Sequence, residues 1–338
     1  MGSLLAVLVA CEPPQHIDPP GPDTGGEDTG DEIELVDDDG DGFPTWSEDP
    51  SQVDCDDSDP EVTPATERFV PEGWFLRGDP DVETPDGDIT VDTERPPSRE
   101  VWVSDFCVDV YEVTNQDFLA LLQWSLEQGH PNETPEGDSL FDFEDDDDVF
   151  PERLLDEGGA FSIEEGYALH PVAEVWHHSA EFYCAWVGKS LPSEAQWEKA
   201  ARGEDTRRHP WGDAEATCEL SNTSMNFNEM CVGDTVDVGS YPGGVSPYGA
   251  HDLIGNMGEW VADWYSTDFY LDGPDEDPLA TQDDAELIDF PESSDYARIA
   301  RGGSFALGAP LDTVHARFVE PEMATSNGLG FRCVRQAP

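Results

Sequence analysis

The spacing of apolar and polar positions changes along the chain, and the changes predict short strands and three helices. Alternation over residues 101–103 predicts a strand, and residues 118–122 follow helical spacing. Residues 177–188 and 191–203 predict two further helices. Beyond them Gly, Pro and Asn dominate, so only short strands are expected. The pattern predicts a fold with few helices and much coil.

Local signals mark the ends of two of these helices. Thr114 or Asn115 is suited to the N-cap of the first helix, because a short polar side chain can accept a hydrogen bond from a free backbone N–H group. Ser193, followed three residues later by Gln196, predicts a capping box at the start of the third helix. Gly203 is suited to the position where that helix stops.

The first part of the chain differs from the rest in composition. Residues 1–11 combine a short apolar stretch with Cys11 and resemble the signal peptide and lipobox of a bacterial lipoprotein. No basic residue precedes the apolar stretch, so an ordinary apolar N-terminus is the alternative. Residues 12–36 predict a disordered tether rich in Asp, Pro and Gly. We therefore expect a lipid anchor on Cys11 that ties the chain to a membrane of the bacterial cell envelope, where disulfides are permitted.

Residues 37–66 form an Asp-rich segment that predicts calcium binding. The spacing of residues 37–48 fits a twelve-residue calcium loop, in which alternate oxygen ligands converge on one ion. The stretch 54–64 continues in the same style, and a solvated acidic linker without an ion is the alternative. The predicted ligands, with Phe43 binding through its carbonyl oxygen, are Asp37, Asp39, Asp41, Phe43 and Glu48.

Acidic residues dominate the whole chain. The sequence has 77 Asp and Glu against 15 Lys and Arg, a formal net charge of −62. This charge excludes a nucleic-acid binder that relies on a basic surface and favours cationic partners or divalent ions. A second acidic run, at about 131–165, lacks calcium-loop spacing and predicts a disordered surface insertion. No apolar run reaches the ~20 residues that a membrane-spanning helix needs.

Six cysteines remain after Cys11, and an even number in an exported chain predicts disulfides, although six cysteines allow many pairings. No two of them have the CxxC spacing that zinc sites and thioredoxin-like redox motifs use. These cysteines are Cys55, Cys107, Cys184, Cys218, Cys231 and Cys333.

Five blocks occur in a fixed order and carry a family resemblance. They read DFCVDVYEVTNQDF, HPVAEVWHHSAEFYCAWVGKSLPSEAQWEKAARG, GAHDLIGNMGEWVADWY, RGGSF and GLGFRCVR. Together they closely resemble the formylglycine-generating enzyme family, also called the sulfatase-modifying factor domain, over about residues 69–336. The resemblance implies an α+β fold similar to that of C-type lectins, with a small antiparallel sheet, few helices, much ordered coil and disulfides.

The resemblance also implies a disulfide between Cys184 and Cys333. Cys218 and Cys231 lie close enough in the sequence to close a local loop, which leaves Cys55 and Cys107 as the remaining pair.

Two further features follow from the family blocks. The family binds structural calcium near its GN-x-x-EW turn, which Asn256 and Glu259 match here. A turn residue is the alternative for Asn256, and a buried salt-bridge partner is the alternative for Glu259. Arg301 and Ser304, from the RGGSF block, are expected at the family's groove.

The chain departs from the family where the chemistry takes place. The family's oxidase binds copper through two cysteines shortly after the RGGS block, because soft thiolates suit Cu(I). Here Leu307 stands at the first position and Asp312 near the second, and no cysteine occurs between Cys231 and Cys333. Copper is therefore not expected. His315 and Met323 are candidate replacements, but packing or surface roles are favoured for both.

Other catalytic groups are weaker candidates. His177 and His178 are adjacent at a helix start, so they point about 100° apart and are expected at the surface rather than on one metal. Ser304, Asp312 and His315 supply the residue types of a hydrolase triad, but residue types alone do not define one.

Two main hypotheses follow. The first is a lipid-anchored envelope protein with a non-catalytic domain of this family, which binds a peptide, a glycan or an envelope protein. The alternative is an enzyme of the family, acting by protein cysteine oxidation or a divergent oxidative reaction. A calcium-regulated adhesion module is a lesser third hypothesis.

Overall fold

The computed structural model describes residues 38–338 apart from 42, 46, 48, 57, 83–95, 144–151, 227–228, 291–293, 308–311 and 327. The described residues belong to one compact unit, Leu35–Pro338. Cys11 and the predicted tether 12–36 lie outside them, as do the predicted calcium ligands Asp37 and Glu48.

The predicted helices are present, with the predicted caps. Thr114 is the N-cap of α1, and its hydroxyl accepts a hydrogen bond from the Asp117 backbone N–H at 3.2 Å. Ser193 and Gln196 form the capping box of α3, and Gly203 follows that helix with a positive φ of 77°. None of the described helices is long and apolar enough to cross a membrane. The helices of the described residues are η1 (Pro50–Gln52), α1 (Asn115–Glu127), α2 (His177–Trp186), α3 (Glu194–Arg202), α4 (Thr267–Asp272) and η2 (Gln282–Asp284).

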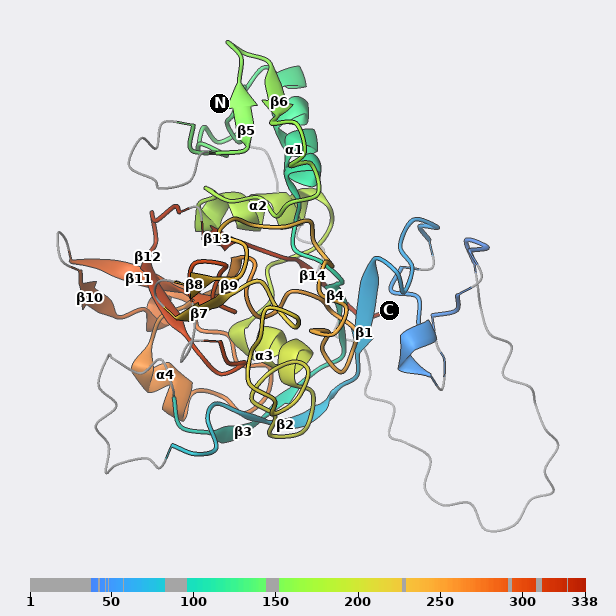
Figure 1. The fold of residues 1–338 in the computed structure, drawn as a ribbon, viewed down its shortest axis with the longest axis vertical. Coiled ribbons are helices and arrows are strands. Elements are labelled where there is room, and N and C mark those ends of the chain that lie inside the picture. Colours follow the sequence, from blue (N-terminus) through green and yellow to red (C-terminus); the bar gives the residue numbers. More distant parts are fainter. Residues whose placement is uncertain are drawn as a thin grey trace, which may run out of the picture. The chain divides into compact units, whose positions relative to one another are not determined.

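The described strands form two sheets and three two-stranded ribbons (Figure 1). The larger sheet has the order β10–β11–β9–β13, with β12 also paired to β11, and only its β13–β9 pair is parallel. The smaller sheet, β1–β4–β14, is antiparallel. The ribbons are β2–β3, β5–β6 and β7–β8. The bounds are β1 (Glu67–Val70), β2 (Gly73–Arg77), β3 (Arg99–Val103), β4 (Phe106–Asp109), β5 (Leu154–Asp156), β6 (Phe161–Ile163), β7 (Ser224–Asn226), β8 (Glu229–Met230), β9 (Gly258–Trp264), β10 (Leu287–Asp289), β11 (Ser294–Arg301), β12 (Phe318–Pro321), β13 (Leu329–Gly330) and β14 (Val334–Gln336). The architecture is the α+β type that the sequence predicts.

Strand β9 joins two apolar clusters because successive side chains of a strand point to opposite faces. Trp260 belongs to the cluster that contains Phe118 of α1, and the next residue, Val261, belongs to the cluster that contains Trp197 of α3. Helices α2 and α3 lie on either side of β9 in Figure 1. The Trp260 indole N–H donates to the Val175 carbonyl oxygen at 2.8 Å, so the buried ring leaves no donor unpaired.

Three disulfides tie the coil to these elements. They join Cys184 to Cys333, Cys218 to Cys231 and Cys55 to Cys107, the same pairs that the sequence analysis names. The first links α2 to the segment before β14, and the last links the Asp-rich segment to β4.

The second acidic run differs from its prediction. Its described parts, 131–143 and 152–165, are folded, and β5–β6 packs against α1. Leu140, Phe141 and Leu154 are buried in the same cluster as α1. The interpretation as a disordered insertion is therefore wrong for these parts, because apolar residues between the acidic ones supply core contacts. Residues 144–151 lie outside the described residues.

Candidate functional site

The turn after β11 leads to Leu307 and Asp312, the two positions at which the family carries its copper-binding cysteines. Gly302 and Gly303 have φ values of 89° and 69°, and a Cβ atom on Gly302 would lie 2.9 Å from the Leu253 carbonyl oxygen, so a larger residue would not fit. Beyond this turn, the Thr223 hydroxyl lies 3.0 Å from both the Leu307 carbonyl oxygen and the Asp312 Oδ1 atom. Thr223 was not singled out from the sequence, because only the fold places it between positions 84 and 89 residues away.

The side chains at these positions do not suit copper. Leu307 is 40% exposed and purely apolar, whereas Asp312 is buried and offers a hard carboxylate oxygen. Every cysteine of the described residues is in a disulfide, so none offers a thiolate here. His315 pairs with Asp79 at 3.1 Å, and Met323 is exposed, as their packing and surface interpretations predict.

Asp312 lines a cavity of about 220 Å³ next to these positions. His209 contributes a buried imidazole that stacks on Trp211, with ring centroids 5.0 Å apart. Burial lowers the pKa of His209, so the ring is neutral at neutral pH. The lining residues are Arg208, His209, Glu215, Ala216, Met225, Asp312 and Thr313.

Arg301 and Ser304 do not line a groove. Both side chains are buried, and the Arg301 guanidinium donates to Glu194 and Glu198 at 2.7 Å each. Burial alone would raise the pKa of the Glu194 carboxyl, but the guanidinium groups of Arg317, Arg77 and Arg301 lower it to about 2. Arg301, the last residue of β11, points into a buried ion network, and the Ser304 hydroxyl accepts the Ala306 backbone N–H at 3.3 Å. Because both side chains are buried, neither is exposed on a groove as the sequence analysis expects.

Asn256 and Glu259 take the roles that the sequence analysis weighed against calcium. Both Glu259 oxygens accept from Arg332, at 2.7 and 2.8 Å, in a buried salt bridge. Asn256 has a positive φ of 58°, and its amide donates to the Glu112 carboxylate at 2.8 Å. The polar atoms of both residues therefore have protein partners, as the alternatives to calcium binding predict.

The Asp-rich segment does bring carboxylates together. Oxygen atoms of Asp39, Asp41 and Asp54 all lie within 4.8 Å of one another. Asp41 Oδ1 also accepts the Phe43 backbone N–H at 2.7 Å, which orients that carboxylate. Asp54 comes from the second Asp-rich stretch, so the two stretches form one cluster rather than two loops.

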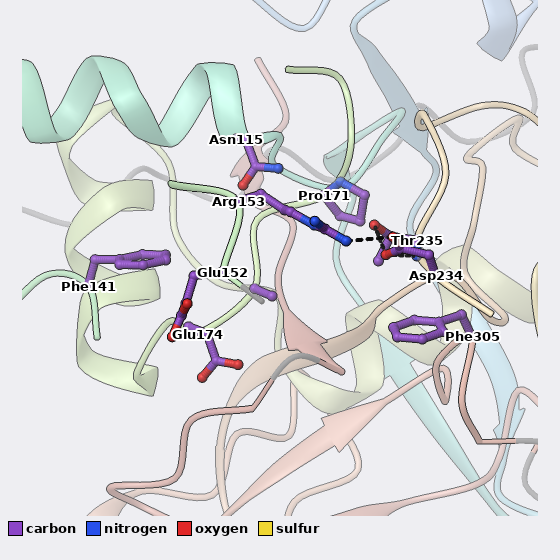
Figure 2. Close-up of a pocket in the computed structure, with 10 residues that line it drawn as sticks. Asn115, Phe141, Glu152, Arg153, Pro171, Glu174, Asp234, Thr235 and Phe305 are labelled. Atoms are coloured by element: carbon purple, nitrogen blue, oxygen red, sulfur yellow. Dashed lines mark hydrogen bonds and ion pairs between the residues drawn. The ribbon is translucent and has the colours of Figure 1, made fainter. Parts of the chain in front are cut away.

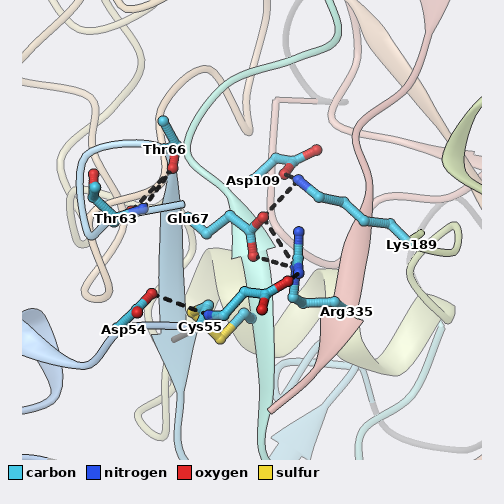
Figure 3. The surroundings of a disulfide bond; sticks show 10 residues. Asp54, Cys55, Thr63, Thr66, Glu67, Asp109, Lys189 and Arg335 are labelled. Atoms are coloured by element: carbon cyan, nitrogen blue, oxygen red, sulfur yellow. Dashed lines mark hydrogen bonds and ion pairs between the residues drawn. A yellow bond between two sulfur atoms is a disulfide. The ribbon is translucent and has the colours of Figure 1, made fainter. Parts of the chain in front are cut away.

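An ion pair and the Cys55–Cys107 disulfide attach this segment to the main domain (Figure 3). Glu67, the first residue of β1, forms ion pairs with Lys189 at 2.7 Å and with Arg335 at 2.9 Å. Arg335 also pairs with Asp56, one residue after Cys55. The carboxylate cluster therefore lies on a segment that is fixed covalently and electrostatically.

A second depression, shown in Figure 2, is too small for a ligand other than water. Its volume is about 20 Å³, and Arg153 extends across it to Asp234, with which it pairs at 2.6 Å. The same guanidinium lies 3.7 Å from the Tyr167 ring centroid. This arrangement indicates a structural role for Arg153.

The structure also corrects the prediction that His177 lies at the surface. Its side chain is buried, and Nε2 lies 2.8 Å from the Val261 carbonyl oxygen, whereas the sequence analysis expects it at the surface. The adjacent His178 bonds to the Ser139 carbonyl oxygen instead. The two rings point to different partners because they stand side by side on the first turn of α2.

The chain belongs to the sulfatase-modifying factor family: the model described as "Sulfatase-modifying factor enzyme 1-like domain" matches residues 56–337. The formylglycine-generating enzyme of Thermomonospora curvata is 31% identical over 302 residues, which cover 78% of this chain and 91% of that protein. The mouse (Mus musculus) protein named inactive C-alpha-formylglycine-generating enzyme 2 is 30% identical, covering 79% of this chain and 85% of that protein.

A Chlamydia caviae protein named serine/threonine-protein kinase pkn1 is 32% identical over 271 residues, or 79% of this chain, but the match spans only 37% of that longer protein. Among solved structures, PvdO from Pseudomonas aeruginosa has a TM-score of 0.55 at 20% identity, covering 80% of this chain and 94% of that one. CarF has a TM-score of 0.51 at 16% identity, covering 81% of this chain and 99% of that one. At these identities the structures establish the shared fold.

Proposed function

We propose that this chain is a non-catalytic member of the family that binds a peptide, a glycan or an envelope protein at the bacterial cell envelope. The observation that carries the proposal is the chemistry at Leu307 and Asp312, where an alkyl chain and a carboxylate replace both thiols. A copper-thiolate reaction has no ligand there. The relatives include a protein named an enzyme and a protein named inactive, and the side chains at Leu307 and Asp312 support the non-catalytic possibility for this chain.

The test is an oxidation assay on residues 12–338, which lack the predicted signal peptide and Cys11. The chain is incubated with Cu(I), oxygen, a reductant and a peptide carrying Cys-x-Pro-x-Arg, and formylglycine is sought by mass spectrometry. A family enzyme with both cysteines is the positive control. We expect no conversion by the folded chain while the control is active. Conversion would support the alternative, an enzyme of the family, and overturn the proposal.

We further propose that the Asp-rich segment binds calcium through Asp39, Asp41 and Asp54. Two oxygens bound to one Ca²⁺ at ~2.4 Å each can be at most ~4.8 Å apart, which is the limit within which these three carboxylates lie. The sequence from residue 12 to 67 contains no Lys or Arg, so the segment carries a dense negative charge that attracts a divalent cation.

Calorimetric titration of residues 12–338 with Ca²⁺ tests this site. Asp41→Asn should weaken calcium binding at least tenfold, because it removes one anionic ligand. Glu61→Gln, an exposed change in the same segment, is the matched control and should bind like the parent. Equal affinity in the parent and Asp41→Asn, or no binding by the parent, would remove the calcium assignment.

The lipid anchor on Cys11 is a proposal as well. It rests on the apolar stretch before Cys11 and the Pro- and Gly-rich segment after it. In a bacterial host, the full chain should fractionate with membranes and carry a diacylglyceryl mass on Cys11. Cys11→Ser should release it into the soluble fraction, and an unmodified Cys11 in the parent would refute the anchor.

A further inference from the structure

The outer face of the β2–β3 ribbon carries two tryptophans. The inner face packs on α3 (Figure 1), and Phe75 and Val101 point from it into the apolar core cluster. Because side chains alternate along a strand, Trp74 and Trp102 point the other way, and the register places them directly opposite each other. Trp74 is 49% exposed, more than any other tryptophan of the described residues. A large aromatic surface left open on a packed ribbon indicates a place where a ligand binds.

The two indole rings meet edge to face and form a corner. Their centroids are 5.9 Å apart and their planes differ by 72°, so a small group beside the pair can contact both rings. The face of an aromatic ring is electronegative, and tryptophan attracts cations more strongly than the other aromatic residues. Backbone hydrogen bonds hold the corner in place, because the Trp102 N–H donates to the Asp275 carbonyl oxygen at 2.6 Å and the Trp102 carbonyl oxygen accepts from the Asp277 N–H at 2.9 Å.

The charges beside the corner are acidic. Glu100 lies two residues before Trp102 on β3, so its exposed side chain is on the same outer face. Glu276, also exposed, forms a β-bridge with Trp102. The nearby guanidinium of Arg99 is already paired with Asp275. The corner therefore combines two aromatic rings with carboxylates, and both attract a positive charge.

The surroundings favour a cation without N–H donors. The Asp277 carboxylate accepts from the Ser104 backbone N–H and from its hydroxyl at 2.7 Å each, and the Asp275 carboxylate accepts from Arg99. These acceptors are already used, whereas a guanidinium needs acceptors in its own plane and a lysine ammonium is strongly hydrated. A quaternary ammonium group has no N–H to satisfy, and its methyl groups suit aromatic ring faces.

We propose that the Trp74–Trp102 corner binds a small soluble quaternary ammonium compound. The methyl groups of the ligand contact both rings, and the Glu100 carboxylate balances the positive charge. A phosphocholine lipid is disfavoured, because the same carboxylates repel its phosphate. None of these residues lines the cavity beside Asp312, so the site goes beyond the proposed function and does not depend on it.

The test is an NMR titration of the ¹⁵N-labelled full chain, with Cys11→Ala to keep it in solution. The probe is choline chloride, and its neutral twin is 3,3-dimethyl-1-butanol, which has the same shape without the charge. Sodium chloride at the same concentrations is the blank. Choline should shift the indole N–H signals of Trp74 and Trp102 and bind at least fivefold more tightly than the neutral twin. Equal binding of the two, or shifts confined to other residues, would overturn the proposal.

Variants separate the corner from general attraction to an acidic protein. Trp74→Leu keeps apolar surface but removes the aromatic face, and should weaken choline binding at least fivefold. Trp186→Leu changes another partly exposed tryptophan and should alter binding less than twofold. If Trp74→Leu does not fold, Glu100→Gln replaces it and should weaken binding at least twofold, whereas Glu127→Gln removes the same charge from an exposed position on α1 and should bind like the parent.

Equal effects of the Trp74 and Trp186 variants, or of the Glu100 and Glu127 variants, would refute the assignment. Binding to phosphatidylcholine vesicles but not to choline would refute it in favour of a lipid surface. A response of the same signals to maltotriose but not to choline would refute it in favour of a glycan. None of these results depends on the oxidation assay, so failure of the inference and failure of the non-catalytic function remain distinguishable.

Discussion

The turn around Glu259 and the loop around Asp39 and Asp41 both carry predicted calcium ligands, but the fold treats their charges differently. Glu259 is completely buried, and Arg332, from 73 residues further on, donates to both of its oxygens. Asp39 and Asp41 meet a third carboxylate, Asp54. A buried carboxylate needs a compensating charge, and at Glu259 the chain itself supplies one in Arg332. Where several carboxylates lie within reach of one position, an external divalent ion can bind them together.

The largest expected effect comes from removing the internal cation. Arg332→Met leaves Glu259 buried without its partner, beside Glu112 and Asp252, and should lower the free energy of unfolding by about 3–5 kcal/mol. Denaturant unfolding followed by tryptophan fluorescence measures the change. A loss below about 1 kcal/mol would mean that Arg332 does not compensate this charge.

Next in size is the disulfide that fixes the aspartate cluster. The double variant Cys55→Ala/Cys107→Ala should lower stability by about 2–4 kcal/mol, because the reduced chain regains entropy in the unfolded state. Thermal unfolding with and without Ca²⁺ checks this. If the variant and the parent have the same melting temperature when both are measured without Ca²⁺, the attached segment contributes nothing to the stability of the domain.

A smaller effect is expected in how the stability of the fold depends on pH, through Asp252 near Glu259. Burial raises the pKa of Asp252 to about 6, although the Gly239 N–H group and Arg332 oppose the rise. A carboxyl whose pKa is higher in the folded state than in the unfolded chain stabilises the fold at low pH, and this contribution is lost as the pH rises through 6.

Asp252→Asn keeps the shape of the side chain but removes its charge. The unfolding free energy of this variant, measured relative to the parent, should therefore be about 1–3 kcal/mol higher at pH 7 than at pH 4. Unfolding free energies of both proteins at these two pH values measure the gain. If the variant and the parent differ by the same unfolding free energy at pH 4 and at pH 7, the pKa of Asp252 is not raised by folding.

The smallest effect is expected at an exposed ion pair. Arg207 and Asp205 form a 2.6 Å salt bridge whose side chains are 25% and 58% exposed. Arg207→Ala should cost less than about 1 kcal/mol, because water and salt screen the pair. Unfolding in low and high salt checks this value. A loss as large as that of Arg332→Met would break the argument that burial sets the importance of these charges.

The Asp-rich segment and the surroundings of Asp312 show which parts of the candidate site could be predicted from the sequence. Asp39 and Asp41 were found because calcium-loop spacing is local, whereas Asp54 was assigned to a separate stretch because its contact with them depends on how the chain folds back. His209 and Thr223 carried no motif at all. They became candidates only when the fold placed them beside Asp312.

The sequence by itself determined the family, the α+β class, the helix caps and the lack of thiols at the two reactive positions, since each depends on residue identity or on spacing within a few turns of chain. Only the tertiary structure decided which charges are paired, that His177 and Arg301 are buried, and that the described parts of 131–165 are folded. These outcomes depend on contacts between distant segments, such as Arg301 with Glu194 across 107 residues. The sequence shows that a residue is charged, but tertiary packing determines whether its charged group contacts water, an arginine or another carboxylate.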